Sequence, residues 1–559
     1  MRDTKSLLKR SWVKGSAVVA ATALSLAIAA PAYAAPLASV KSATAQDNVV
    51  TITFNDGSKD VTGKLTLLED GIFRYNIDPA GEFSAYAKPK SADHIAKIQA
   101  QPDTSDKYTR PNASVKDENG KFVISAAQGK TTIELDKATA KMTIKHDGKV
   151  VMEESAPLDL DAAGTVQKLV KHEGENFFGG GTQNGRFIHT GKTINIANES
   201  NWVDGGVSSP NPFYWSSKGY GVLRNTFADG SYNFGETKAD TTTALHKENE
   251  LDAYYFVADA ANGKSTAPIA QDLLQAYFKV TGNPILLPEY GFYTGTLNAW
   301  NRDMWSKTPK GGYGKRQIKG SEPASDPNAG ETLYEKGGTG VRMEPNSCVE
   351  TLNGHGPTEQ TENIPEGVTY NREFSAQHHL DTYIENDIPM GYFLPNDGYG
   401  SGYGQNGYGK TGGVNPDGSS SPERLAAIAA NVQNLKEFSE YCKKFGVATG
   451  LWSQSYIFPD SNPATEWQVL RDFANEVRTG GVTTLKTDVA WVGHGYSMAL
   501  DAVRSGYETV TTEVSKRPNI ITLDGWAGTQ RYGAVWTGDQ SGGNWEYIRF
   551  HVPTFIGQS

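Results

Sequence analysis

The pattern of hydrophobic and polar positions changes near residue 285. Before this point, short runs such as 49–54, 121–124 and 141–144 alternate apolar and polar residues, and turn signals such as Asn55-Asp56-Gly57 separate them. Alternation with a period of two at this spacing is typical of antiparallel strands. Residues 35–285 are therefore predicted to form an N-terminal antiparallel β-sandwich, with one amphipathic helix near its end at 268–280.

From residue 286 onward, strand-like runs alternate with helical stretches. The strands are predicted at 290–296, 390–398, 448–454, 483–489, 519–525 and 533–539, and the helices at 373–387, 421–445, 466–479 and 497–515. Repeated βα units form a parallel sheet with helical crossovers. Residues 286–559 are thus predicted to form a (β/α)8 TIM barrel, whose chemistry lies at the carboxyl ends of its strands.

This count gives six strands where a barrel has eight. The sequence stops at Ser559, within the predicted segment after the sixth strand, so we expect a barrel truncated after strand six and a fragment of a longer protein. A miscount within residues 301–370 is the alternative. That stretch is rich in Gly, Pro, Lys and Glu without clear periodicity, and it is predicted to be an irregular insertion.

The first 34 residues have the pattern of a secretory signal peptide. A basic segment precedes the apolar run 15–30, and Ala32-Tyr33-Ala34 fits the small-residue cleavage rule. The run is too short and too rich in Ala for a membrane span. We therefore expect cleavage after Ala34 and a secreted protein without a membrane span.

Charge and aromatic content narrow the classes of partner. The net charge is −10, and because residues 1–34 carry +4, the remainder carries −14. Such an acidic protein lacks the basic surface that a nucleic-acid-binding protein needs. The 11 Trp, 26 Tyr and 21 Phe suit stacking on sugar rings, so an oligosaccharide or glycoconjugate is the expected partner. Two cysteines and no CxxC or HExxH motif imply no metal site, and no cofactor is predicted.

Three acids lie at the ends of successive predicted strands, namely Asp488, Asp524 and Asp539. Retaining glycosidases use two carboxyl groups about 5–5.5 Å apart, one as nucleophile and one as proton donor. The alternative is structural, because an Asp after a strand often caps the following helix. Spacing alone leaves both interpretations open.

Several motifs together resemble glycoside hydrolase family 31. The segment 525–539 resembles the family's acid/base region, and Leu485-Lys486-Thr487-Asp488 resembles its nucleophile strand in the form of the xylosidase-like branch. Further similar segments are 386–389 with 393–397, 177–181, 218–222 and 288–292. The resemblance implies a galactose-mutarotase-like N-terminal domain and a retaining exo-α-glycosidase that needs no cofactor.

The resemblance also implies roles for individual residues. Asp488 matches the nucleophile, Asp539 the acid/base and Asp397 an acid that binds the sugar. The remaining expected substrate-binding residues are Trp452, Lys486, Asp524, Trp526, Arg531 and Trp536.

Two departures from the family pattern bear on the sugar. Leu523 stands where many members have an Arg that holds sugar hydroxyls, and Trp491 stands where many have Glu. An apolar pocket suits a 2-acetamido group, so an α-N-acetylgalactosaminide is favoured. The alternatives are an α-glucosidase or α-xylosidase, an α-transglycosylase and, in another class, a non-catalytic glycan-binding protein or inactive fragment.

One aromatic segment of the N-terminal region has two interpretations. Asn201-Trp202-Val203-Asp204 is predicted to pack in the core of the sandwich. The alternative is a loop that reaches the barrel and closes the sugar site.

Overall fold

The computed structural model describes residues 36–88, 107–161, 163–298, 303–307, 313–317, 334–335, 348–355, 369–395, 422–453, 473–488, 496–538 and 544–558. Asp397, Asp539, Trp491 and the predicted signal peptide lie outside these residues. The chain divides into two compact units. The first contains described residues of Tyr293–Leu451 and Thr479–Gly481, and the second those of Ala32–Phe292, Trp452–Arg478 and Val482–Ser559.

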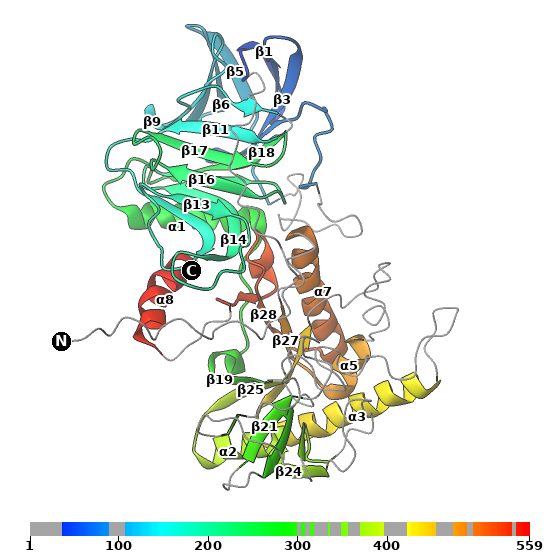
Figure 1. The fold of residues 1–559 in the computed structure, drawn as a ribbon. Helices are drawn as coiled ribbons and strands as arrows, with labels where there is room; N and C mark the ends of the chain where they lie inside the picture. Colours follow the sequence, from blue (N-terminus) through cyan, green and yellow to red (C-terminus); the bar gives the residue numbers. More distant parts are fainter. Residues whose placement is uncertain are drawn as a thin grey trace, which may run out of the picture. The chain divides into compact units, whose positions relative to one another are not determined.

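Three antiparallel sheets make up the N-terminal part of the second unit. The eight-stranded sheet has the order β1-β2-β3-β4-β18-β15-β14-β12, and the two five-stranded sheets have the orders β10-β11-β17-β16-β13 and β5-β6-β7-β8-β9. Figure 1 shows β11, β17, β16 and β13 running side by side. Their bounds are β1 Ser39–Gln46, β2 Val49–Asn55, β3 Asp60–Glu69, β4 Ile72–Ile77, β5 Ala113–Glu118, β6 Lys121–Ala126, β7 Thr131–Asp136, β8 Met142–His146, β9 Lys149–Glu153, β10 Asp159–Leu160, β11 Thr165–Val170, β12 Phe177–Gln183, β13 Thr193–Ile196, β14 Val207–Ser216, β15 Tyr220–Arg224, β16 Gly230–Phe234, β17 Thr241–His246 and β18 Leu251–Val257.

The alternation predicted for residues 49–54, 121–124 and 141–144 is confirmed in β2, β6 and β8, whereas β4, β15 and β18 are buried along their whole length. In β6, for example, Phe122, Ile124 and Ala126 are buried while the residues between them are partly exposed. Such a strand packs its apolar face against a core because this removes apolar surface from water. As predicted, all neighbouring strands within these three sheets pair in antiparallel fashion.

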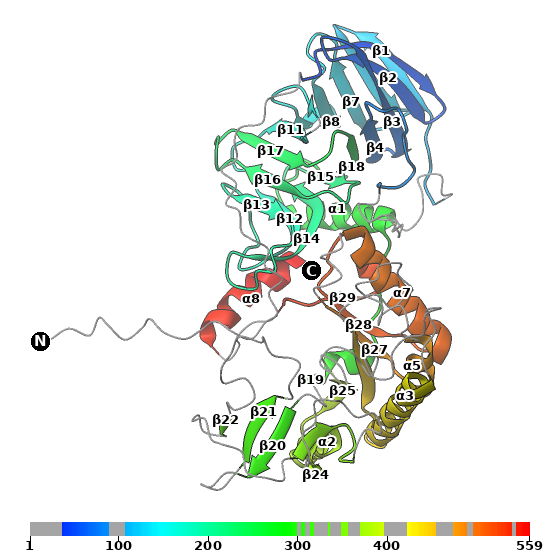
Figure 2. The same ribbon diagram turned by 45° about the vertical axis from the view of Figure 1, so that its right-hand side comes forward.

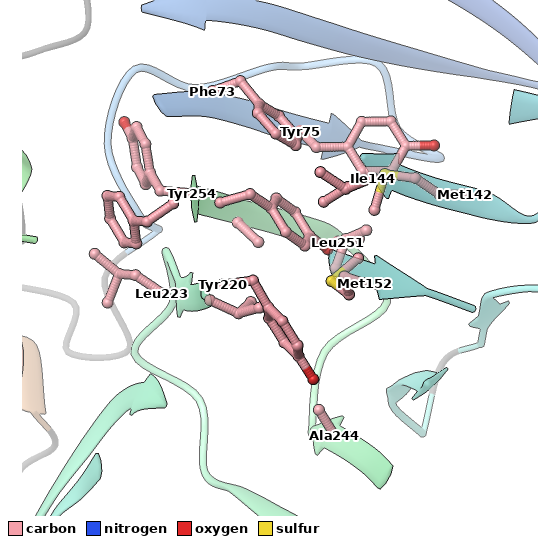
Figure 3. Packing of buried hydrophobic residues seen from close by; sticks show 14 of the residues in the cluster. Phe73, Tyr75, Met142, Ile144, Met152, Tyr220, Leu223, Ala244, Leu251 and Tyr254 are labelled. Carbon is pink, nitrogen blue, oxygen red and sulfur yellow. The ribbon is translucent and has the colours of Figure 1, made fainter. Parts of the chain in front are cut away.

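Side chains from all three sheets share one hydrophobic core. Figure 3 shows Phe73 and Tyr75 of β4 near Met142 and Ile144 of β8, with Leu251 of β18 below them. The ring of Phe73 stacks on that of Tyr255 with centroids 5.2 Å apart. This continuous core makes the N-terminal sheets (β1–β18) a rigid support for the segments that pack on them.

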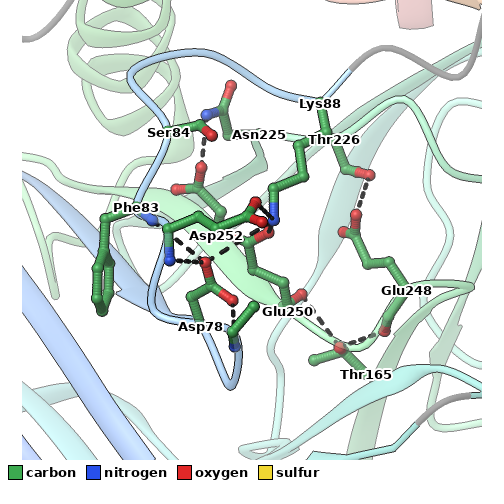
Figure 4. A network of polar contacts seen from close by, with 12 residues as sticks. Asp78, Phe83, Ser84, Lys88, Thr165, Asn225, Thr226, Glu248, Glu250 and Asp252 are labelled. Atoms are coloured by element: carbon green, nitrogen blue, oxygen red, sulfur yellow. Dashed lines mark hydrogen bonds and ion pairs between the residues drawn. The ribbon is translucent and has the colours of Figure 1, made fainter. Parts of the chain in front are cut away.

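A polar network ties the loop 78–88 to Glu250, which directly precedes β18 (Figure 4). Asp78 accepts hydrogen bonds from the backbone N–H groups of Ala80, Glu82 and Phe83. The ammonium group of Lys88 lies 2.9 Å from Glu82 and 3.1 Å from Glu250. Loop 78–88 is thus fixed by both backbone and charged contacts.

Helix α1 (Thr266–Thr281) confirms the helix predicted at 268–280. It buries Ile269, Leu273 and Tyr277. The next element corrects the prediction of a strand from residue 290, because Glu289–Phe292 form the 3₁₀ helix η1. The Gly291 N–H donates to the Pro288 carbonyl, so a turn replaces the start of the strand.

The first unit contains the first three predicted parallel strands. They are β19 (Thr294–Asn298), β25 (Met390–Pro395) and most of β26 (Ala448–Ser453), and parallel pairing joins β19 to β25 and β25 to β26. Two helices accompany them, α2 (Ala376–Glu385) and α3 (Pro422–Lys443). Helix α2 starts later than the predicted residue 373, because Ser375 caps it by accepting a hydrogen bond from the His378 N–H.

The stretch 301–370, predicted to be irregular, contains short strands where it is described. Strands β20 (Asp303–Lys307), β21 (Tyr313–Gln317), β22 (Tyr334–Glu335), β23 (Cys348–Thr351) and β24 (Thr369–Ser375) form a sheet in the order β22-β21-β20-β23-β24. The pair β20 and β21 is green in Figure 2. The prediction was wrong here because runs of five residues or fewer, separated by Gly, Pro and charged residues, give too little periodicity.

The second unit contains the other three predicted parallel strands. They are β27 (Thr484–Thr487), β28 (Asn519–Thr522) and β29 (Ala534–Val535), paired in parallel in that order. Each is shorter than predicted. The associated helical elements are α5 (Phe473–Gly480), α7 (Tyr496–Val514), η3 (Thr529–Arg531) and α8 (Trp545–Gln558). Helix α7 covers β27 and β28, as both ribbon views show (Figures 1 and 2).

The segment after β28 packs directly on the N-terminal sheets. The Ser209 hydroxyl donates to the Leu523 carbonyl at 2.6 Å, and the Asn211 side chain donates to the Gly525 carbonyl at 3.0 Å. A β-carbon at residue 525 would lie 2.8 Å from the Ser209 β-carbon, so only Gly permits this approach. The β-rich region thereby positions the carboxyl end of β28.

Candidate active site at the end of strand β27

The site starts from the alternation of side chains along β27. Lys486 and Asp488 are two residues apart, so they project to the same side of the chain at the carboxyl end of the strand. The Lys486 Nζ atom lies 3.3 Å from Oδ2 of Asp488. Lys486 keeps only 4% of its side chain exposed, and Asp488 keeps 15%, so water screens this pair weakly.

Trp452, on β26, supplies a second donor to the same carboxylate oxygen. Its indole Nε1–H donates to Oδ2 of Asp488 at 2.8 Å, and the Trp452 residue is only 3% exposed. A hydrogen bond to an ionised acceptor is stronger than a neutral one. Trp452 and Lys486 therefore both fix the position of the Asp488 carboxyl group.

An aromatic ring covers the cation. The Lys486 Nζ atom lies 3.9 Å from the centroid of the Trp536 ring, which follows β29. This is a cation–π contact. The structure thus brings together four of the predicted site residues: Trp452, Lys486, Asp488 and Trp536.

Asp524 has a different environment from the one predicted. It is 3% exposed, and its carboxyl group accepts hydrogen bonds from the Thr529 hydroxyl at 2.6 Å and the Trp526 N–H at 3.2 Å. Burial raises its pKa to about 6, against the opposing effect of these hydrogen bonds. Its observed contacts hold the turn that leads into η3.

Trp526 is fully buried, with none of its surface exposed. Its indole N–H donates to the Thr226 carbonyl at 2.8 Å, and its ring stacks on Tyr496 with centroids 3.9 Å apart. These contacts join the segment after β28 to the N-terminal sheets and to α7. In this structure Trp526 is therefore a packing residue.

Arg531 lies at the end of η3, where its Nε–H donates to the Gly528 carbonyl at 2.9 Å. Its guanidinium carbon is 4.8 Å from the centroid of the Tyr532 ring, and burial lowers its pKa. These contacts shape the η3 turn. Asp397 and Asp539 lie outside the described residues, so their predicted roles stay predictions.

Two aromatic residues that sequence analysis did not assign to the site contact residues that it did assign. Trp202, for which core packing was predicted, is partly exposed, and its ring centroid is 6.4 Å from that of Trp536. Tyr496 starts α7 and stacks on Trp526. The aromatic segment 201–204 was a usable signal for Trp202, but no local pattern pointed to Tyr496.

The described residues contain no group of three or more His, Cys, Asp or Glu side chains that could hold a metal ion. Among the described helices, none is long and apolar enough to cross a membrane.

Comparisons with known proteins agree with this fold. Residues 62–233 match the glycosyl hydrolase 31 N-terminal galactose mutarotase-like domain, and residues 424–559 match the glycosyl hydrolases family 31 TIM-barrel domain. A curated α-xylosidase from Emericella nidulans is 30% identical over 162 residues, which are 28% of this chain and 18% of that protein.

Two solved structures of enzymes have the same fold. A dextranase from Flavobacterium johnsoniae, in complex with glucose, superposes with a TM-score of 0.61 at 14% identity, over 94% of this chain and 60% of that chain. A cycloalternan-forming enzyme from Listeria monocytogenes gives a TM-score of 0.60 at 13% identity, over 94% of this chain and 47% of that chain.

The chain spans less than two thirds of the length of each of these three relatives. Two regions of the chain nonetheless match an N-terminal domain and a catalytic domain of one family, in the expected order. The chain belongs to glycoside hydrolase family 31.

Proposed function

We propose that the protein is a retaining exo-α-glycosidase in which Asp488 attacks the anomeric carbon. The observation that supports this role is the double contact of Asp488 Oδ2 with the Trp452 indole N–H and the Lys486 ammonium group. A nucleophilic carboxylate must be ionised and held in one orientation before the substrate binds. Both contacts hold the Asp488 carboxyl group in one orientation.

In the proposed reaction, a carboxylate oxygen of Asp488 forms an ester bond to the anomeric carbon while the glycosidic C–O bond breaks. The leaving oxygen takes a proton from Asp539, the proposed acid/base. Water then attacks the same carbon and gives its proton to Asp539, which restores both carboxyl groups and releases the sugar with its α configuration retained. This assignment of Asp539 rests on its family-like sequence context.

For the sugar, we propose an α-N-acetylgalactosaminide. Leu523 stands where many members of the family have an Arg, and its side chain is apolar and only 1% exposed. Without that guanidinium, position 523 offers no bidentate donor for sugar hydroxyls. The half-buried ring of Trp536 offers apolar surface for an acetamido methyl group.

An α-xyloside is the second candidate. It is favoured by the α-xylosidase from Emericella nidulans, which is 30% identical over 162 residues. A xyloside lacks the C6 hydroxymethyl group of a hexose, so discrimination between these candidates lies in the parts of the pocket that contact C2 and C6.

The test is hydrolysis of four aryl glycosides by the full chain: α-N-acetylgalactosaminide, α-xyloside, α-glucoside and α-galactoside. Turnover of the first is expected, with release of the α anomer visible by NMR, and Asp488→Ala and Asp488→Asn should abolish it. Transglycosylation would appear as longer products at high substrate concentration. Binding without turnover of any of the four, unchanged by Asp488→Asn, would favour a glycan-binding protein instead.

We also propose that the protein is exported, since residues 1–34 have the pattern of a signal peptide. Sequencing the N-terminus of protein from the culture medium tests this, and a mature chain that starts at Ala35 is expected.

A further inference from the structure

The loop between β13 and β14 carries Trp202 to the segment that follows β29. The rings of Trp202 and Trp536 have centroids 6.4 Å apart and planes inclined by 32°. Trp202 also lies against the backbone of Gly538, where an added β-carbon would be 2.1 Å from its Cδ1 atom and 2.3 Å from its Cγ atom. The indole thus occupies the space that any side chain at position 538 would need.

Gly538 suits this contact in a second way. Its φ angle is +95°, in a region that residues with a side chain rarely adopt. The backbone therefore adopts a left-handed conformation at Gly538, and the Trp202 ring packs against it. Because glycine adopts many backbone conformations at little cost, neighbouring contacts decide which one the chain takes here.

The loop that carries Trp202 is itself held from one side by Asn184. The Asn184 side chain donates to the Asn201 carbonyl at 3.0 Å, and the Asn184 carbonyl accepts from the Gly205 N–H at 2.9 Å. These two bonds bracket Trp202 within its loop. Because Asn184 directly follows β12 and is fully buried, the loop is tied to the core of the N-terminal sheets.

A second set of contacts holds the same loop from α7. The Asn198 N–H donates to the Tyr496 hydroxyl at 2.7 Å, and the Asn198 side chain donates to the Ser208 carbonyl at 2.8 Å. Tyr496 in turn donates to Asp229 at 3.1 Å. Hydrogen bonds thus hold the loop at both ends, and they keep Trp202 in place.

We infer that Trp202 is a positioning residue for the general acid/base. Asp539 follows Gly538 directly in the sequence, so the direction in which the chain leaves Gly538 determines where the Asp539 side chain starts. By packing on Gly538, Trp202 sets that direction from the N-terminal sheets. This inference rests on the function proposed above and assigns to the β-rich region a part in the proton-transfer step.

The inference differs from two other roles by its kinetic signature. A ring that only stacks on the sugar would contribute to KM for every substrate. A ring that only stabilises the fold would lower the melting temperature and the fraction of active protein. A ring that positions the acid instead slows glycosides with poor leaving groups more than those with good ones, because only the former need the proton.

The test uses the full chain with Trp202→Ala and two substrates of the sugar that the protein hydrolyses: its α-glycosyl fluoride, which needs little acid assistance, and its methyl α-glycoside, which needs much. The quantity compared is kcat/KM, since it includes no step after formation of the glycosyl-enzyme. We expect a loss of at least ten-fold on the methyl glycoside and less than three-fold on the fluoride. We also expect a changed basic limb of the pH profile, where the acid is lost.

Trp202→Phe retains a ring and should recover part of the methyl glycoside activity. Val203→Ala, an exposed neighbour in the same loop, is the matched control and should change neither substrate. Gly538→Ala should reproduce the selective loss, because its β-carbon would displace the indole. It provides a second route to the same result if Trp202→Ala folds poorly.

Equal losses on both substrates, or no loss on either, would overturn the role of Trp202 while leaving Asp488→Ala inactive and the proposed function intact. Failure of the unchanged protein to hydrolyse any α-glycoside would instead overturn the proposed function and, with it, this inference.

Discussion

The indole of Trp452 donates a 2.8 Å hydrogen bond to the carboxylate of Asp488, although 36 residues separate them in the sequence. The same oxygen atom lies 3.3 Å from the ammonium group of Lys486. A partly buried carboxylate with two such partners has its orientation fixed before any substrate arrives. Substitutions of Trp452 and Lys486, the two partners of this carboxylate, are therefore the most direct tests of the site.

Removing the donor while keeping an aromatic ring should weaken catalysis. Trp452→Phe loses a hydrogen bond to a charged group, which is worth about 1.5–3 kcal/mol. If the bond is made fully in the transition state, kcat/KM should fall about ten- to hundred-fold. Steady-state kinetics on the best substrate of the glycoside panel measures this.

The control for Trp452→Phe is Trp215→Phe, which makes the same change at a buried Trp stacked on Phe178 in the N-terminal sheets. It should leave kcat/KM within about two-fold for protein that remains folded. Equal activity of the Trp452→Phe variant and the unchanged protein would contradict a role for the indole N–H.

The Lys486 ammonium group should matter through its charge. Lys486→Met keeps much of the length of the side chain but removes the cation that lies between Asp488 and Trp536. We expect kcat/KM to fall by at least ten-fold, because the Asp488 carboxyl group loses one of the two contacts that hold it in place. Kinetic assays against the unchanged chain provide the measurement.

Lys444→Met is the matched control, because Lys444 also lies over an aromatic ring, 5.0 Å from the centroid of Tyr441, but is exposed to solvent. It should have full activity. A Lys486→Met variant that is as active as this control would show that the cation is dispensable.

Asp524 should affect stability more than turnover. Its carboxyl group accepts hydrogen bonds from Thr529 and Trp526 in a buried position, so Asp524→Ala should lower the free energy of unfolding by about 1–3 kcal/mol. Denaturant unfolding measures this. The folded variant should retain kcat/KM within about ten-fold, whereas a fully stable variant without turnover would support the predicted contact with sugar.

The contrast between Asp488 and Asp524 shows what the sequence could and could not predict. Both are acids at the end of a parallel strand, so strand periodicity located both correctly. Their environments differ because Ser209 and Asn211 hold the chain after β28 against the N-terminal sheets, which buries Asp524 and Trp526. Contacts between residues about 300 positions apart leave no periodic signal in a single sequence.

The order of the parallel strands could be predicted from the hydrophobic pattern, but their lengths could not. Apolar runs between helical stretches indicated all six parallel strands, and each begins within a few residues of its predicted start. The end of β28 was placed too far along the chain, since Leu523 and Gly525 turn to meet the N-terminal sheets instead of extending the strand. Tertiary contacts decided that boundary.

The pH dependence of stability offers a test far from the active site, at Glu154. This fully buried carboxyl group accepts hydrogen bonds from the Gln167 side chain at 2.7 Å and from the Met142 N–H at 2.8 Å. Burial nevertheless dominates and raises its pKa from 4.5 to about 7. In the native protein the group therefore keeps its proton up to about pH 7, while the unfolded chain loses it near pH 4.5.

The sign of the effect follows from proton linkage. Between pH 4.5 and 7 the unfolded state binds fewer protons at this site than the native state, so the free energy of unfolding falls as pH rises. The contribution is fully present below pH 4.5 and is lost by about pH 7, and it amounts to ~3 kcal/mol. Glu154→Gln has no proton to lose, and a rotated Gln167 amide can accept from its N–H. Denaturant unfolding at several pH values should therefore give the variant a shallower decline than the unchanged protein over this window, and identical slopes would mean that Glu154 ionises as easily in the folded protein as in the unfolded chain.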